Sequence, residues 1–226
     1  MENLESVLAP LDGVDWEDID QVGSASRKVL NAIDADRGIL RRAIDDLPSR
    51  PELLAMCEHP DIDDADGKGQ QLDKIVLYAN AETGVRVRLH TFWPGYYDLP
   101  HNHRWTFASL VLRGGFRHYL YGDQGPDDAV PQAAPQALTV REERAGTTYA
   151  LHHRALHALI AEPGSVSLVL RGPAAKDRSF LIDPQTGTRL WHFGASTESP
   201  EAVQRKRMTP ALLQDLSAKF REWDLF

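Results

Sequence analysis

The sequence lacks several features that would assign it to a common functional class. It has 226 residues and a single cysteine, Cys57, which excludes both a disulfide within the chain and a zinc site built on paired cysteines. Lysine and arginine number 25 against 33 aspartate and glutamate residues, which gives a formal net charge of −8. The chain therefore has no basic excess, and we expect it to bind neither nucleic acid nor an anionic membrane surface.

Sorting signals and nucleotide-binding motifs are also missing. No run of residues approaches the roughly 18 apolar positions of a membrane-spanning helix. The first residues are acidic and do not show the basic-then-apolar pattern of a secretory signal, so we expect a cytoplasmic protein. The sequence contains no GxGxxG pattern, no P-loop and no GxSxG nucleophile turn.

The pattern of apolar residues divides the chain into three regions. Residues 1–60 show helical periodicity and are expected to form an N-terminal helical extension. Residues 73–194 show strand-like alternation, and residues 195–226 are expected to form a C-terminal helical extension whose main helix starts at Thr209-Pro210. The polar stretch from His59 to Leu72 is interpreted as a linker, and the proline-bearing stretch from Asp123 to Gln136 as a loop.

The central region predicts about ten short strands. They are expected at 74–78, 85–89, 105–113, 116–121, 137–142, 147–151, 155–160, 165–171, 178–182 and 189–193. Gly114-Gly115 lies between two of these strands and predicts a hairpin turn. Many short strands separated by turns are typical of a sandwich or a barrel.

Nine histidines are distributed unevenly along the chain. His101 and His103 are separated by one residue, so on a strand both imidazoles would point to the same side. A third histidine from a distant strand would complete a three-nitrogen metal site with open coordination positions. We favour His157, which precedes an apolar strand, although the adjacent His152 and His153 remain alternatives that could replace or supplement it.

The segment Gly95-Tyr-Tyr-Asp-Leu-Pro-His101-Asn-His103, followed by a glycine at 114 or 115, resembles the first motif of the cupin superfamily. The stretch from Gly146 through His157 to Ser165-Val-Ser-Leu-Val-Leu-Arg-Gly-Pro173 resembles the looser second motif. The resemblance covers roughly residues 73 to 193. It implies an all-β fold, a double-stranded β-helix or jelly-roll cupin barrel, here with N- and C-terminal α-helical extensions.

The positions at which the sequence departs from the cupin pattern indicate which group of cupins it resembles. The position of the cupin glutamate ligand falls at Phe107 or Ala108, neither of which can bind a metal. The remaining three-histidine set is similar to that of the cysteine dioxygenase group. The tract from Ser167 to Pro173 is also similar to that group, but Val169 replaces its histidine and Arg171 replaces its tyrosine. Cysteine itself is therefore a doubtful substrate.

The resemblance implies a metal site on His101, His103 and His157 that holds Fe(II), with Zn, Mn or Ni as other candidates. Three neutral imidazoles leave the full charge on the metal and positions for a substrate and dioxygen. Arg171 occupies the place of the group's tyrosine and is assigned both a catalytic and a substrate-binding role. Lys74 lies near the place of the group's carboxylate-binding arginine, although a salt bridge would also explain it.

Strand alternation suggests further site residues. Arg88 shares a strand face with Arg86 and His90, and could bind a substrate carboxylate if that face lines the barrel. Tyr119 could hydrogen-bond a ligand, which makes it a catalytic candidate, although such tyrosines often close a barrel mouth. Trp105 follows His103 at a period of two and is predicted to form part of the substrate-binding wall.

The sequence thus predicts a metal-dependent cupin oxygenase that acts with dioxygen on a small, polar, carboxylate-bearing substrate. Two alternatives stay open. One is a non-catalytic cupin that binds a small ligand or a metal, and the other is a zinc-dependent isomerase or hydrolase. The terminal helices are expected to cover one sheet or to form the interface of a homodimer.

Overall fold

The computed structural model describes residues 3–59, 71–123, 135–194 and 197–226. Most of the predicted linker and of the predicted proline-bearing loop lies outside these ranges. The helices and 3-10 turns are α1 (Leu4–Val7), η1 (Ala9–Leu11), α2 (Ile19–Ala35), α3 (Gly38–Asp46), η2 (Leu47–Ser49), α4 (Pro51–Leu54), α5 (Pro200–Arg205) and α6 (Pro210–Glu222). The strands are β1 (Leu72–Ala79), β2 (Arg86–Phe92), β3 (Phe107–Arg113), β4 (Gly115–Asp123), β5 (Thr139–Arg144), β6 (Thr148–Leu151), β7 (Ala155–Ala161), β8 (Val166–Arg171), β9 (Ser179–Ile182) and β10 (Arg189–His192).

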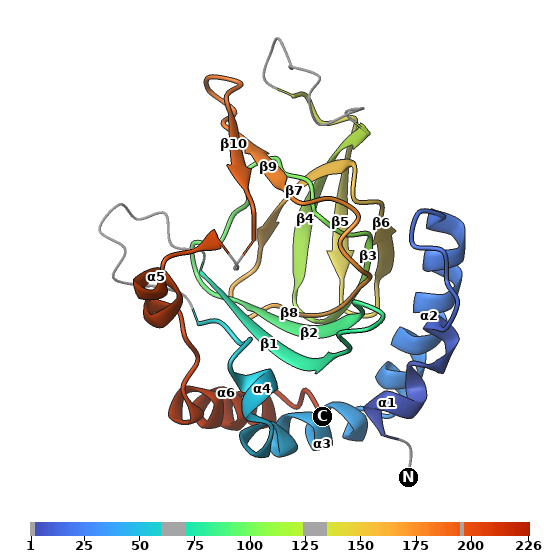
Figure 1. The fold of residues 1–226 in the computed structure, drawn as a ribbon, viewed down its shortest axis with the longest axis vertical. Coiled ribbons are helices and arrows are strands. Elements are labelled where there is room, and N and C mark those ends of the chain that lie inside the picture. The colour runs from blue at the N-terminus through green and yellow to red at the C-terminus, as the bar shows by residue number, and fades with distance from the viewer. Residues whose placement is uncertain (1–2, 60–70, 124–134, 195–196) are drawn as a thin grey trace.

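Two antiparallel sheets face each other (Figure 1). One has five strands in the order β1-β2-β8-β3-β6, and the other has three in the order β5-β4-β7. A short ribbon of β9 and β10 lies at one end. Side chains from both sheets meet between them, for example Phe92 and Val111 from the larger sheet with Phe116 and Leu159 from the smaller one. This architecture is the predicted jelly-roll barrel, and the fold prediction is confirmed.

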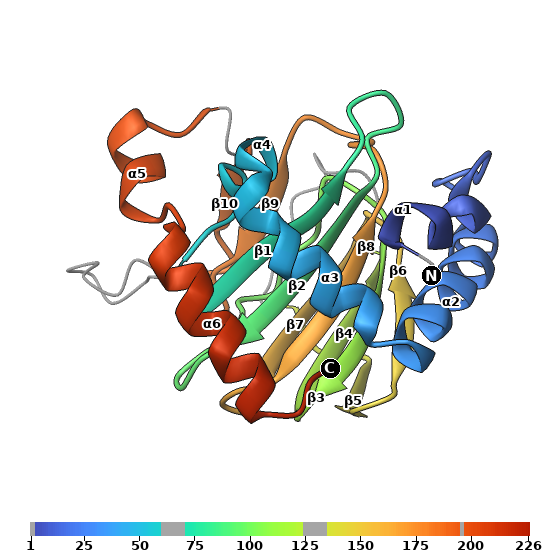
Figure 2. The ribbon, with the colours of Figure 1, turned by 90° about the horizontal axis from the view of Figure 1, so that it is seen from below.

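The helices cover the outer face of the five-stranded sheet (Figure 2). In this view α3 and α6 run across the sheet, and α2 lies beside β3 and β6 at its edge. Each long helix begins where its sequence provides a cap: the Asp18 side chain accepts hydrogen bonds from the amides of Asp20 and Gln21, and the Thr209 hydroxyl accepts one from the amide of Leu212.

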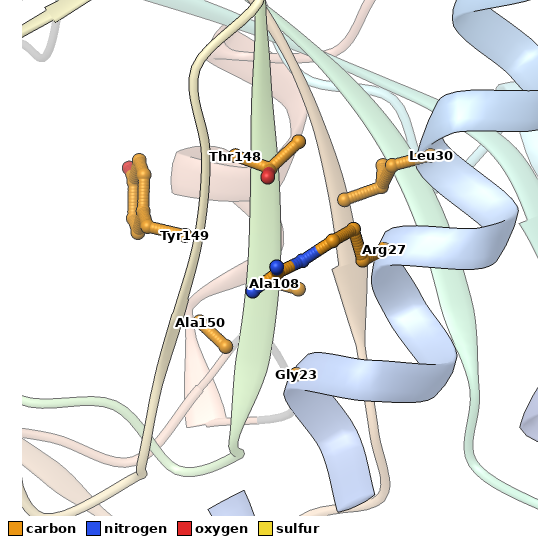
Figure 3. Close-up of a pocket in the computed structure, with 7 residues that line it drawn as sticks. All are labelled: Gly23, Arg27, Leu30, Ala108, Thr148, Tyr149 and Ala150. Atoms are coloured by element: carbon orange, nitrogen blue, oxygen red, sulfur yellow. The ribbon is translucent and has the colours of Figure 1, made fainter. Parts of the chain in front are cut away.

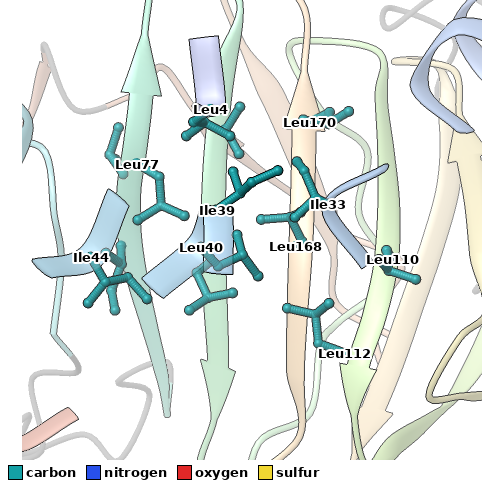
Figure 4. Close-up of a cluster of buried hydrophobic side chains, with 14 of the residues drawn as sticks. Leu4, Ile33, Ile39, Leu40, Ile44, Leu77, Leu110, Leu112, Leu168 and Leu170 are labelled. Carbon is teal, nitrogen blue, oxygen red and sulfur yellow. The ribbon is translucent and has the colours of Figure 1, made fainter. Parts of the chain in front are cut away.

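The main hydrophobic core lies between this sheet and the helices (Figure 4). Ile39 and Leu40 of α3 pack toward the leucines of the sheet, among them Leu168 and Leu170 of β8, and all four are buried. Since neighbouring residues of a strand point to opposite sides, the residues between these leucines face the other sheet and line the barrel. The helical layer therefore determines which side chains are directed into the barrel.

The predicted hairpin at Gly114-Gly115 is wrong. Within the described ranges, β3 pairs with β8 and β6, whereas β4 pairs with β5 and β7, so the chain passes at this point from one sheet to the other. Gly114 has a φ of 69°, and a Cβ added to it would lie 2.4 Å from the Ser165 hydroxyl oxygen. The glycine pair is therefore required by a sharp corner between sheets that also approaches β8 closely.

Among the described helices, none is both long and apolar enough to cross a membrane.

Candidate metal centre

Three imidazoles converge between the sheets. The nitrogen atoms of His101, His103 and His157 that could act as ligands all lie within 4.8 Å of one another. The ring centroids of His101 and His157 are 4.5 Å apart, and those of His103 and His157 are 5.0 Å apart. His157 is buried, with 3% of its surface exposed, whereas His101 and His103 are partly exposed. The cluster is therefore deep but accessible to solvent.

The backbone fixes the relative positions of these histidines. His157 lies in β7 and forms an antiparallel bridge with His101, in which each amide donates to the carbonyl of the other residue at 2.9 and 2.8 Å. His103 lies in irregular backbone, whereas the sequence predicted that it lies on the same strand as His101. It is held by Asn102, whose side-chain oxygen accepts a hydrogen bond from the amide of Phe180 at 3.0 Å.

The hydrogen bonds of the imidazoles leave nitrogen lone pairs free for a metal. The Nδ1 of His101 donates to the carbonyl oxygen of Leu99 at 2.9 Å, so its Nε2 carries a lone pair. The Nε2 atoms of His103 and His157 face each other at 2.8 Å. Two nitrogen ligands bound at right angles to one ion would be separated by about 3 Å. The donor set thus fits a divalent transition metal.

The electrostatic environment favours the neutral form of two of these rings, those of His103 and His157. Burial, together with the neighbouring His101, holds the pKa of both His103 and His157 well below that of an ordinary imidazole. A neutral ring is the form that binds a metal ion. His103 and His157 can therefore bind a metal at neutral pH without first losing a proton.

A second row of buried polar residues supports His157. Its Nδ1 lies 2.9 Å from the Nε2 of His118, a fully buried residue of β4. The Nδ1 of His118 lies 3.3 Å from the Glu143 carboxylate, which also pairs with Arg141 at 2.5 Å. Burial lowers the pKa of His118 while Glu143 opposes that change. This chain of contacts fixes the orientation of the His157 ring.

Three of the predicted substrate-binding residues lie close to the histidine cluster. The Trp105 ring is 4.6 Å from the His103 ring, measured between centroids. The guanidinium carbons of Arg171 and Arg88 lie 5.3 and 6.0 Å from the centroid of Trp105. Both arginines occupy positions on β2 and β8 that point into the barrel.

Lys74 and Tyr119 are placed differently from the expectation. The Lys74 ammonium forms an ion pair with Glu58 at 3.1 Å, which is the alternative that the sequence left open. Tyr119 follows the inward-facing His118 on β4 and therefore points outward, beside the half-exposed Val140 and in hydrogen-bond contact with Arg117. The Tyr119 side chain points away from the barrel, so the catalytic role predicted for it is corrected.

His152 and His153 do not join the cluster. They form a separate group with Glu17, whose carboxylate lies 3.4 and 3.1 Å from their Nε2 atoms and has its pKa lowered, chiefly by the hydrogen bond from His153. The backbone carbonyl of His153 accepts a hydrogen bond from the amide of His103 at 3.4 Å. The structure therefore brings together the set that contains His157, and it gives the other two histidines a contact with the N-terminal segment.

Sequence reasoning overlooked several residues around the cluster. No role was predicted for His118, yet this residue is fully buried, and its spacing of two from the inward Phe116 was the available signal. Tyr96 and Asp98 were not singled out. The Tyr96 hydroxyl donates to Asp98 at 2.5 Å, and burial raises the pKa of Asp98 although His101 opposes that shift.

A small hollow of about 50 Å³ lies elsewhere, between α2 and the edge formed by β3 and β6 (Figure 3). Figure 3 shows Arg27 reaching from α2 toward Ala108, while Tyr149 points to the other side of its strand. The seven residues that line this hollow include no histidine. It is therefore a packing gap under the helix rather than part of the metal centre.

No family model matches the sequence, and no curated protein sequence does. Many solved structures share part of the fold. A cupin 2 conserved barrel domain protein from Rhodopseudomonas palustris is 18% identical and has a TM-score of 0.42, with 57% of this chain and 79% of that chain covered. An RmlC-like cupin from Shewanella frigidimarina is 19% identical, with a TM-score of 0.37 and coverages of 49% and 83%.

An acetylacetone dioxygenase from Acinetobacter johnsonii is 12% identical, with a TM-score of 0.35 and coverages of 54% and 72%. The chain's two facing sheets and their strand order define a double-stranded β-helix barrel, as the sequence predicted, and the three histidines converge inside it. The finer likeness to the cysteine dioxygenase group stays a prediction.

Proposed function

We propose that this protein is a metal-dependent oxygenase of the cupin type, with His101, His103 and His157 as ligands of Fe(II). Dioxygen and a small carboxylate-bearing molecule are its substrates. The observation that carries the proposal is the convergence of three imidazoles inside the barrel, with the pKa of His103 and of His157 held well below the ordinary value. Such a set leaves an octahedral ion about three open positions, enough for a bidentate substrate and dioxygen.

The bound Fe(II) would supply the electron transfer that links dioxygen to the substrate. The chain's own residues bind the substrate and orient it. Arg171 and Arg88 bind the anionic end of the substrate by charge-assisted hydrogen bonds, and the Trp105 ring packs against both guanidinium groups. Phe107 lies against His103 at 4.7 Å between ring centroids and limits the access of water to the ligands.

The remaining protein groups keep the ligands in place. His118 and Glu143 hold the His157 ring from behind, and the Leu99 carbonyl holds His101. Ligands fixed in this way need little reorganisation when the metal binds or when the substrate displaces water.

The test is the metal content of the purified protein, combined with oxygen uptake in the presence of small carboxylic acids, amino acids and thiol acids. We expect stoichiometric iron and substrate-dependent uptake. Zinc without uptake would favour the non-redox isomerase or hydrolase, and a folded protein that takes up no metal would favour a ligand-binding role. Either result would contradict the proposal.

Single variants test the ligand set. His101→Ala should lose the metal and remain folded, as judged by circular dichroism. His59→Ala is the matched control, since it also removes an imidazole but one that pairs with Asp73 outside both histidine groups, and it should keep its metal. Equal metal content in the two variants would overturn the assignment. The homodimer stays a prediction that sedimentation equilibrium can test.

A further inference from the structure

The inner face of β2 and β8 carries an unusual number of arginines. Arg86 and Arg171 are direct partners in the register of the two strands, and Arg88 lies two residues further on the same face of β2. A fourth arginine, Arg104, is close enough to act electrostatically on Arg86 and Arg171. All four side chains keep part of their surface exposed, so a solute can reach them.

These arginines lack acidic partners. Across the part of the chain that the structure describes, no carboxylate forms an ion pair with Arg86, Arg88 or Arg171. Glu58 acts on Arg88 electrostatically, but its carboxylate already pairs with Lys74 and with Lys206, at 3.1 and 3.4 Å. Like charges therefore face one another inside the barrel without neutralisation.

Several hydrogen-bond donors of this cluster also lack an acceptor among the described residues. Among the described residues, none is a hydrogen-bond partner of the buried Nε atoms of Arg88 and Arg171 or of the indole nitrogen of Trp105. Arg171 donates only to the adjacent carbonyl of Gly172, at 3.0 Å. A buried donor without an acceptor destabilises the fold, so an arrangement with several such donors indicates a ligand that supplies acceptors.

The number of free donors bears on the charge of that ligand. Burial and the neighbouring arginines lower the pKa of Arg171 to about 8 and that of Arg88 to about 10, which still leaves both guanidinium groups charged at neutral pH. One carboxylate has two oxygens and satisfies one guanidinium fork. Two forks on different strands, with Arg86 beside them, require more oxygens and more negative charge than a single carboxylate provides.

We infer that the substrate carries a doubly charged oxyanion group, of the phosphoryl or dicarboxylate kind, which binds to Arg86, Arg88 and Arg171 beside Trp105. This inference rests on the proposed function for the reaction itself and adds the class of substrate. The other end of the molecule extends past the Trp105 ring to His103, the ligand that is one aromatic contact away. The dianionic group thus determines which substrate is selected, and the histidine cluster determines where it reacts.

The experiment is a calorimetric titration of the full chain with inorganic phosphate, malonate and acetate at low ionic strength. The same titrations are repeated on His101→Ala, so that direct binding of the anion to a metal is subtracted. We expect phosphate or malonate to bind at least about tenfold more tightly than acetate, since the dianion gains a second charge-assisted pair. Preference for phosphate would identify a phosphoryl-type group, and preference for malonate a dicarboxylate. Equal affinity for acetate and both dianions would overturn the inference.

Variants locate the binding. Arg171→Gln and Arg88→Gln should each weaken dianion binding by about tenfold or more. Arg117→Gln, which removes the same charge from the outer face where Arg117 pairs with Glu142, should bind as the wild type does. Equal losses in all three variants, or none in the first two, would contradict the inference.

A thermal readout separates a binding defect from a folding defect. Because Arg171→Gln removes repulsion between like charges, the ligand-free variant should melt at the same temperature as the wild type or higher, while its stabilisation by phosphate or malonate is lost. Failure of the oxygenase proposal is distinguishable, since binding is measured without turnover. Dianion binding without oxygen uptake would overturn the proposed reaction and leave this inference standing.

Discussion

His157 is the residue on which the candidate site depends most, because both of its ring nitrogens are engaged. Nε2 faces His103, and Nδ1 contacts His118, which in turn contacts Glu143. A carboxylate at the end of such a chain fixes the tautomer of the rings and increases the basicity of the ligand. Residues that touch neither metal nor substrate can therefore affect metal affinity.

Glu143→Gln should weaken metal binding by about 10–100-fold, the usual effect of removing an outer partner of a metal-binding histidine. The measurement is competition with a chromophoric chelator. Glu142→Gln is the control, since Glu142 immediately precedes Glu143 and pairs with Arg117 on the outer face. If the affinity of Glu143→Gln equals that of the control, the contact chain has no role in holding His157.

At this scale the sequence predicted the ligands but not their support. The spacing of His101 and His103, together with a histidine before an apolar strand, was sufficient to select the three residues that the structure brings together. The sequence predicted a role for Tyr119 and none for its neighbour His118. The structure reverses this, because a shift of one residue along a strand reverses the direction of the side chain. The register of β4 against β7 pairs His118 with the buried Leu159, which shows that His118 is the residue that points inward.

Among the elements, the ten strands were anticipated with small shifts at their ends, since alternation of apolar residues is a local property. The partners of the strands were not. Whether a glycine pair ends a hairpin or turns a corner depends on which sheet receives the next strand, and the nearest contact of Gly114 is Ser165, far along the chain. Such pairings result from packing between distant segments, which the spacing of residues does not encode.

The helix-covered face of β8 allows a test of packing. Leu168→Ala should lower the free energy of unfolding by about 2–5 kcal/mol, because Leu168 is fully buried between the sheet and the helices. Urea denaturation measures the change. Leu190→Ala is the control, since Leu190 is 49% exposed and its loss should have little effect. A similar effect of both substitutions would show that the helices do not pack on this sheet.

The contact between α4, β1 and the C-terminal helical segment predicts a pH dependence. Burial alone would raise the pKa of Glu58, but Lys74 and Lys206 lower it to about 2 from 4.5. The folded state therefore binds the proton less readily than the unfolded chain, and Glu58 stabilises the fold above pH 4.5. This contribution, of the order of 3 kcal/mol, should be lost as the pH falls from 4.5 to 2.

The check is the free energy of unfolding measured by urea at several pH values. Glu58→Gln should show a smaller decrease between pH 4.5 and 2 than the wild type. Glu52→Gln provides the comparison, because Glu52 is fully exposed and pairs only with Arg50, and it should follow the wild-type curve. Identical curves for all three proteins would rule out the buried ion pairs as the cause.

For the molecule as a whole, one core includes the helical regions and the barrel together. The main cluster joins Val29 and Leu30 of α2, Leu40 of α3 and Phe220 of α6 to the strands β1, β2, β3 and β8. A chain that begins at residue 71 would expose to water the part of the outer face that α2 and α3 cover. We expect it to lack a cooperative thermal transition, measured by circular dichroism, and to regain one when residues 1–59 are supplied as a separate polypeptide. Cooperative melting of the shortened chain alone would show that the barrel is an independent unit.

The loop that carries His152 and His153 connects the surface of the protein to the metal centre. The Glu17 carboxylate contacts the ring of His153. The backbone carbonyl of His153 accepts a hydrogen bond from the amide of His103. Two hydrogen bonds thus link the segment before α2 to the backbone of His103, whose imidazole belongs to the cluster. The segment before α2 therefore supports the backbone of His103 from outside the barrel.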